Sequence, residues 1–112
     1  KARRVVVIFQ PHRFSRTKLL AAHFGRAFKG ASLVYVADIY PAGEKPLAGV
    51  SSKLILESMR KSGVACAAFP GALEVARDLR PGDVVLTLGA GDIWKTGEDL
   101  LRRRRGGSAS AV

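Results

Sequence analysis

Continuous apolar runs return at intervals along this chain, and they constrain its fold more than any other feature. The three clearest runs are VVVIF at Val5–Phe9, LVYVA at Leu33–Ala37 and VVLTL at Val84–Leu88, and a shorter run lies at Val64–Phe69. Runs rich in β-branched residues are typical of strands that are buried on both faces, as in a parallel sheet. We therefore expect four buried strands.

The segments between these runs carry helical spacing and helix end signals. Ser15 is placed to cap a first helix, and Ser51 or Ser52 a second one that Gly63 closes. The apolar residues expected to face the core are, helix by helix, Leu20, Phe24, Ala27 and Phe28; Ile55 and Met59; Leu73, Ala76 and Leu79; and Ile93, Trp94, Leu100 and Leu101. His23, in the first helix, is expected to be a packing residue.

Strands that alternate with helices predict an α/β fold. The expected architecture is a Rossmann-like three-layer sandwich, a mainly parallel sheet with helices on both faces and right-handed crossovers. Ligands bind such sheets beyond the carboxyl ends of the strands. Three predicted loops leave those ends, at Gln10–Ser15, Asp38–Gly49 and Gly89–Asp92. We expect the functional residues to lie in these loops.

The size and charge of the chain exclude several other classes of protein. A chain of 112 residues has room for one domain, and its single cysteine excludes an internal disulfide. The longest uncharged stretch, Ser62–Leu73, falls short of the about 20 apolar residues that a membrane span needs. The net charge is +10, but three positive charges lie in residues 1–4 and four in Arg102–Arg105. We expect a mildly basic domain at 1–101 and a disordered basic tail at 102–112.

The first loop and the start of the next helix, QPHRFSRT at 10–17, gather His12, Arg13 and Arg16 within five residues. Arg13 and Arg16 are three apart and can point the same way, so that two guanidinium groups hold a carboxylate or a phosphate. The start of a helix also favours anions and disfavours cations, so something must offset the two arginines. His12 can exchange a proton near neutral pH. The alternative interpretation is a solvated basic turn.

The third loop and the start of the next helix have the sequence GAGDIWKT at Gly89–Thr96. This stretch comes close to the spacing of a nucleotide-binding P-loop. Trp94 stands where that loop requires its second glycine, so we reject this reading. Gly89 and Gly91 either form a tight strand-to-helix turn or let a substrate approach the edge of the sheet. We treat both glycines as candidate pocket-lining residues.

The second loop, Asp38–Gly49, has 12 residues and carries Tyr40 and Glu44. Loops of this length without structure of their own are uncommon in small domains and are often functional. Asp38 and Tyr40 are therefore candidate pocket-lining residues, although a solvated loop stiffened by prolines fits the pattern equally well. Nowhere do His, Cys and carboxylate residues have the spacing of a metal site, so we expect no metal ligand.

Three stretches, in this order and spacing, resemble the C-terminal domain of the Mur ligases, and within that family the ligases that add L-alanine. They are FQPHRFSRT at Phe9–Thr17, DIYPAGEKP at Asp38–Pro46 and GDVVLTLGAGDIWK at Gly82–Lys95. The resemblance covers roughly residues 4–101. The QPHR-type turn sets these ligases apart from the other Mur ligases.

This resemblance implies an enzyme, a cytoplasmic ligase of peptidoglycan and cell-wall synthesis that depends on ATP and Mg²⁺. In that family the lactyl carboxylate of UDP-N-acetylmuramate is phosphorylated, and the amine of L-alanine attacks the acyl phosphate. The UDP-sugar belongs to a first domain, and ATP and Mg²⁺ mainly to a central domain with the P-loop. Neither domain is in this chain, which also lacks a starting methionine. We therefore expect a piece of a longer chain that is inactive alone.

By its match to the family's motif, the turn would contribute His12, Arg13 and Arg16 to substrate binding. From its residue type, we also expect His12 to be catalytic, as the acceptor of the amine proton. The expected partners are L-alanine, UDP-N-acetylmuramate, ATP and the other two domains, with neither a specific nucleic acid nor a membrane. Two alternatives stay open. One is an isolated Rossmann-like binding module without catalysis of its own, and the other is a nucleic-acid binder that uses the arginine tail.

Overall fold

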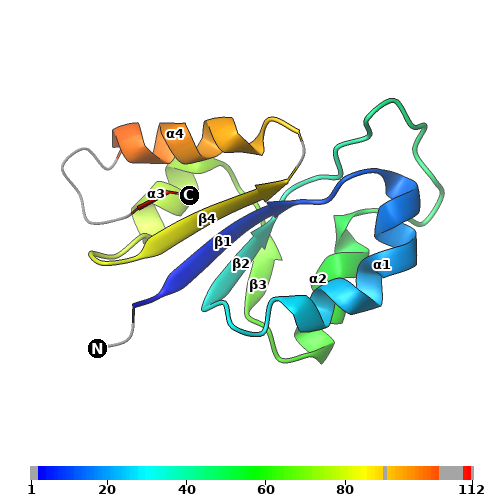
Figure 1. Cartoon of the computed structure of the whole chain (residues 1–112), viewed down its shortest axis with the longest axis horizontal. Helices are drawn as coiled ribbons and strands as arrows, with labels where there is room; N and C mark the ends of the chain where they lie inside the picture. Colours follow the sequence, from blue (N-terminus) through cyan, green and yellow to red (C-terminus); the bar gives the residue numbers. More distant parts are fainter. Residues whose placement is uncertain (1–2, 90, 104–109, 112) are drawn as a thin grey trace.

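Strands and helices alternate through the chain in the computed structural model, which describes residues 3–89, 91–103 and 110–111 (Figure 1). The elements are β1 (Val5–Gln10), α1 (Phe14–Ala27), β2 (Leu33–Val36), α2 (Ser52–Lys61), β3 (Cys66–Ala68), α3 (Ala72–Asp78), β4 (Val84–Gly89), α4 (Ile93–Arg103) and the two-residue β5 (Ser110–Ala111). The sheet order is β3-β2-β1-β4-β5, and each of these pairings is parallel. The predicted α/β fold is confirmed.

The sheet separates two apolar layers. On one face Phe9 of β1 packs against Phe24 of α1 and against Phe28, which directly follows that helix, with ring centroids 5.1 Å apart in both pairs. The same face buries Ile55 and Met59 of α2. On the other face, the alternate residues of β1 pack with α3 and α4; that layer includes Val6, Ile8, Val75, Ile93 and Leu100. The continuous apolar run of β1 therefore has a simple cause, because both sides of the strand are covered.

The helix ends and faces agree only in part with the sequence. Ser51 caps α2, as predicted, by accepting a hydrogen bond from the backbone N–H of Lys53 at 3.2 Å. Ser15 does not cap α1, which begins at Phe14. In α3 the core face contains Val75 rather than Leu73, which is 42% exposed. His23, expected to pack, is exposed because it lies on the outer side of α1.

Helix α4 has the predicted core residues Ile93 and Leu100, but not Leu101, which is 46% exposed. The residues that it buries are Ile93, Gly97 and Leu100, whereas Trp94 is 54% exposed. The helix also runs to Arg103, two residues beyond the predicted end of the domain. Residues 104–109 and 112 lie outside the described residues, so the disordered tail stays a prediction.

An ion pair at the amino edge of the sheet ties β1 to β4. Arg4 donates to Asp83 through Nη2 at 2.6 Å and through Nε at 3.1 Å, and the backbone N–H of Arg80 adds a bond at 2.8 Å. Asp83 is only 2% exposed. The hydrogen bond from Arg4 holds the pKa of the Asp83 carboxyl below its usual range. Arg4, counted above among terminal charges, is thus a structural residue.

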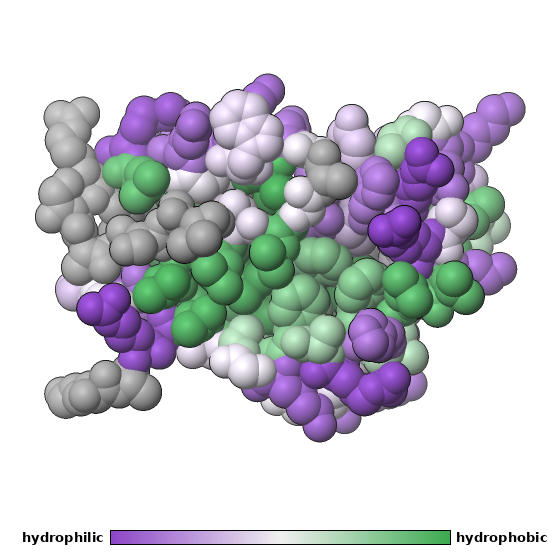
Figure 2. Space-filling model, in the orientation of Figure 1, coloured by the Kyte–Doolittle hydropathy of each residue, from purple (hydrophilic) through white to green (hydrophobic). Residues whose placement is uncertain are grey.

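One part of the sheet is uncovered. Leu86 and Leu88 of β4 lie on the same face as Val7 and Phe9, their register partners in β1. Neither α1 nor α2 reaches β4 in the described part of the chain, and Leu88 is 41% exposed. Figure 2 shows apolar side chains running across this side of the molecule, where β4 and β1 lie in Figure 1.

Candidate functional site

The carboxyl edge of the sheet brings the first two predicted loops together. The backbone N–H of Arg13 donates to the carbonyl oxygen of Tyr40, and the N–H of Tyr40 donates to the carbonyl of Pro11, both at 2.8 Å. His12 and Tyr40 also form a parallel bridge of their own. The parallel pairing of β1 with β2 therefore continues beyond both strands, between Pro11–Arg13 and Tyr40.

His12 and Tyr40 form a stacked pair at this edge. Their ring centroids are 6.0 Å apart and their planes are inclined by 17°. His12 is half-buried, and its imidazole makes no hydrogen bond within residues 3–89 and 91–103. One face of the imidazole is thus held by Tyr40, while its nitrogens keep their capacity to accept or donate a proton.

The backbone of Arg13 is strained. Its φ is 67° and its ψ is 146°, a region that residues with a side chain rarely adopt. Thr17, which is fully buried, donates to the Arg13 carbonyl oxygen from its hydroxyl at 2.8 Å and from its backbone N–H at 3.1 Å. Such a conformation costs about 1–3 kcal/mol and persists only where the surroundings impose it. This conformation lets α1 begin at Phe14, only four positions after the last residue of β1, Gln10.

The side chains of Arg13 and Arg16 share one open hollow of about 410 Å³ along α1, which Ser15, Leu19 and Leu20 also line. Both arginines are exposed and neither forms an ion pair in the described part of the chain. The two arginines thus line the same hollow, while their joint hold on a carboxylate stays a prediction. The hollow is not lined by His12, Asp38, Tyr40, Gly89 or Gly91, so the structure does not bring the predicted site residues into one pocket.

Glu44 also belongs to this edge of the sheet, although no sequence signal assigns it to the site. Its Oε1 accepts from the backbone N–H groups of Phe14 at 2.7 Å and Ser15 at 3.1 Å, and its Oε2 accepts from the Ser15 hydroxyl at 2.5 Å. The hydrogen bond from that hydroxyl is the main cause that lowers the pKa of Glu44. A carboxylate from the second loop therefore supplies the offset that two arginines at a helix start require.

The two glycines of the third loop make room for the protein's own side chains. A Cβ on Gly91 would lie 2.6 Å from Cδ1 of Tyr40 and 2.7 Å from Oε1 of Gln10. A Cβ on Gly89 would lie 3.0 Å from the Gln10 carbonyl oxygen. The tight-turn interpretation accounts for both. Oε1 of Gln10 is buried there without a hydrogen-bond partner among the described residues.

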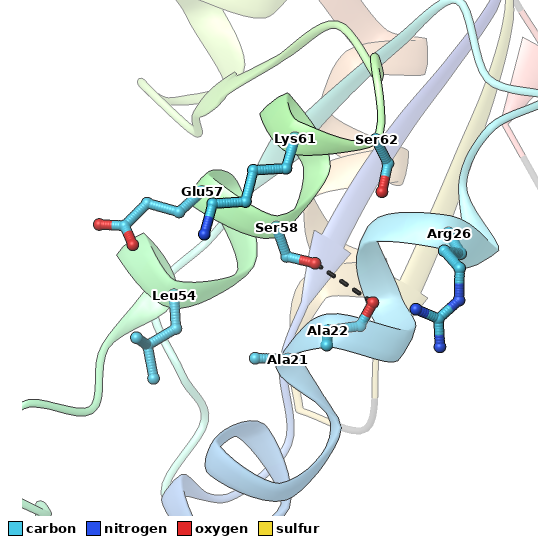
Figure 3. A pocket seen from close by; sticks show the side chains of 8 residues that line it. All are labelled: Ala21, Ala22, Arg26, Leu54, Glu57, Ser58, Lys61 and Ser62. Atoms are coloured by element: carbon cyan, nitrogen blue, oxygen red, sulfur yellow. Dashed lines mark hydrogen bonds between the residues drawn. The ribbon is translucent and has the colours of Figure 1, made fainter.

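A second hollow lies between α1 and α2, away from these loops (Figure 3). It has a volume of about 360 Å³, and its polar lining includes Arg26, Glu57, Ser58 and Lys61. The Ser58 hydroxyl points across it and donates to the Ala22 carbonyl oxygen at 3.3 Å. None of the predicted site residues lines this hollow.

Two other kinds of site are absent from the described ranges. No group of three or more His, Cys, Asp or Glu residues there is arranged to hold a metal ion. Likewise, no helix among them combines the length and the apolar character that crossing a bilayer requires.

The fold and the edge site together define a Rossmann-like α/β domain with a basic strand-to-helix turn. No family model matches the chain. It is 54% identical over 99 residues to the UDP-N-acetylmuramate–L-alanine ligase of Endomicrobium trichonymphae, covering 88% of this chain and 22% of that protein. The ligase of the same name from Pelotomaculum thermopropionicum is 47% identical over 108 residues, covering 92% and 23%. For that of Geobacter sulfurreducens the identity is 46% over 106 residues, covering 90% and 23%.

The chain is therefore homologous to UDP-N-acetylmuramate–L-alanine ligases over about nine-tenths of its own length. This confirms the resemblance seen in the three sequence motifs. The chain spans only 22–23% of the length of these three relatives, so it corresponds to a domain-sized part of such a ligase.

Proposed function

We propose that this chain is the amino-acid-positioning domain of an ATP-dependent ligase that joins L-alanine to UDP-N-acetylmuramate. The observation that carries the proposal is the high identity, along nearly the whole chain, to ligases named for that reaction. The reaction belongs to peptidoglycan synthesis and thus to building the cell wall, and its setting would be the cytoplasm. The basic turn at the carboxyl edge of the sheet gives the domain the chemistry that this role needs.

Arg13 and Arg16 would hold the carboxylate of L-alanine. Their guanidinium groups line the same hollow and have no ion-pair partner in the described part of the chain. Hydrogen bonds between a guanidinium and a carboxylate are charge-assisted and directional. Holding the amino acid in this way orients its amine toward the acyl group, a contribution worth several kcal/mol when the geometry is right.

His12 would take the proton that the alanine amine loses as it attacks the acyl phosphate. Its imidazole nitrogens are free of hydrogen bonds within the described ranges, and Tyr40 fixes the plane of the ring. A histidine suits this role because its ordinary pKa lies near neutral pH. The site residues of the proposal are therefore His12, Arg13 and Arg16.

The described part of the chain shows no binding site for ATP or Mg²⁺. Trp94 occupies the position where a P-loop needs a glycine. The described ranges also offer no cluster of carboxylates and histidines for the ion. We propose that ATP and Mg²⁺ are held mainly by the central domain of the longer protein, and that the 112-residue chain alone has no ligase activity.

The test is an Arg13→Ala substitution in the longer protein that contains this chain. We expect the KM for L-alanine to rise about tenfold or more, which is the size of a lost charge-assisted contact, while the KM for ATP stays near its original value. Arg77→Ala is the matched control, because Arg77 is exposed on α3 and has no partner in the described part of the chain. Equal increases in both KM values would contradict carboxylate holding by Arg13.

A further inference from the structure

The basic turn receives two separate contacts from the second loop. The first is the backbone pairing with Tyr40, which holds the segment from Pro11 to Arg13. The second is the carboxylate of Glu44, which bonds the next two residues of the chain, Phe14 and Ser15. The loop therefore holds the turn on both sides of the strained Arg13 backbone.

The position of the Glu44 carboxylate decides what it can do. It accepts three hydrogen bonds, two from backbone N–H groups at the start of α1 and one from the Ser15 hydroxyl. It forms no ion pair with Arg13 or Arg16, and neither does any other carboxylate in the described ranges. Glu44 thus neutralises the positive end of the helix dipole, and the charge of Arg13 adds a smaller contribution that lowers the pKa of Glu44. The hydrogen-bond donors of both guanidinium groups are not engaged by the Glu44 carboxylate.

Two other arrangements of charge at this turn would hinder the binding of a carboxylate. A carboxylate paired directly with Arg13 or Arg16 would compete with an incoming carboxylate for the same guanidinium donors. Without any carboxylate, the two arginines would face the free N–H groups and the positive dipole at the start of α1. The observed arrangement avoids both outcomes.

We propose that Glu44 is a positioning residue for the amino-acid substrate, acting through the basic turn. It fixes the first turn of α1, and with it the direction in which Arg13 and Arg16 present their guanidinium groups. This inference rests on the proposed function, because it assumes that these arginines hold the alanine carboxylate.

The experiment compares Glu44→Ala and Glu44→Gln in the longer protein, with Glu57→Gln as the control. Glu57 is an exposed carboxylate on α2 without a hydrogen bond or ion pair in the described part of the chain. We expect Glu44→Ala to raise the KM for L-alanine about tenfold, the scale of lost charge-assisted hydrogen bonds, with kcat at saturating alanine and the KM for ATP unchanged. Glu44→Gln should recover part of the loss, because its amide oxygen can still accept from the helix N–H groups.

Two further variants keep the test decisive if Glu44→Ala folds poorly. Ser15→Ala removes one of the three hydrogen bonds and leaves the carboxylate in place, so it should raise the KM for L-alanine by a smaller factor. In the double variant Arg13→Ala, Glu44→Ala the KM for L-alanine should rise by less than the product of the two single effects, because Glu44 acts in part through Arg13.

The outcomes separate this inference from the proposed function. If Arg13→Ala raises the KM for L-alanine but the Glu44 and Ser15 variants do not, the role of Glu44 is wrong and the proposed function stands. If Arg13→Ala itself leaves that KM unchanged, the proposed function fails first. A lower KM in Glu44→Ala would mean that Glu44 competes with the substrate, and this would overturn the positioning role.

Discussion

Among the residues that the structure describes, Asp83 is the only charged one that is buried. It is almost completely buried and accepts hydrogen bonds from Arg4 and from the backbone of Arg80. We expect Asp83→Asn to lower the free energy of unfolding by about 2 kcal/mol, below the range for a fully buried pair because Arg4 is partly exposed. Urea unfolding measures this loss. Asp38→Asn, at an exposed carboxylate without a described partner, is the control and should change stability little.

The same variant isolates the pH dependence of this ion pair. Arg4 lowers the pKa of Asp83 in the folded chain, so the unfolded chain binds the proton more readily. The stabilisation is therefore complete above the unfolded pKa, about 3.9, and is lost as the pH falls through the lower folded value. The stability difference between the parent chain and Asp83→Asn should be constant near neutral pH and should shrink in acid. A difference that stays constant down to pH 2 would contradict this account.

Residues that are close together in the chain could be assigned to the site from the sequence, whereas residues that meet only in the fold could not. The cluster of His12, Arg13 and Arg16 could be found because its members are neighbours in the chain. Glu44 could not be assigned, because its partners are about 30 positions away and its loop has no regular pattern. The sequence around Arg4 likewise shows only a terminal charge, because its partner Asp83 is 79 positions away.

At the scale of elements, the strands could be predicted well and the helix faces less well. Runs such as VVVIF leave few alternatives to a doubly buried strand, and all four predicted strands are present. Helix α3 has seven residues, so more than one apolar face fits its sequence. In α4 a buried glycine, Gly97, lies in the row that faces the sheet, and a pattern built on large apolar residues passes over it.

The contact between α1 and α2 depends on another buried glycine. A Cβ on Gly25 would lie 2.1 Å from Oγ and 2.5 Å from the backbone oxygen of Ser58, so the two helices would have to separate. We expect Gly25→Ala to destabilise the chain by about 1–3 kcal/mol through overpacking, although alanine favours a helix by about 1 kcal/mol. Thermal unfolding measures the change. Gly30→Ala, where nothing lies within 4 Å of the new Cβ, should be nearly neutral.

At the scale of the whole molecule, β4 closes the centre of the sheet, whereas β5 only extends its edge. A chain that ends at Pro81 loses the pairing partner of β1, the carboxylate for Arg4 and the apolar face of α4. We expect it to show no cooperative unfolding transition in circular dichroism. A chain that ends at Arg103 keeps these contacts and should unfold cooperatively. A cooperative transition in the shorter chain would show that β1, β2 and β3 suffice.

The central position of β1 has a consequence for how this protein is made. Among the strands β1 to β4, β1 leaves the ribosome first. One of its two neighbours in the sheet, β4, leaves last of these four. Until then β1 can pair only with β2, so the β1–α1–β2 unit is the natural place for folding to begin. The pairing of β4 with β1 aligns Val5 with Val84, 79 positions away, and such distant pairing slows folding.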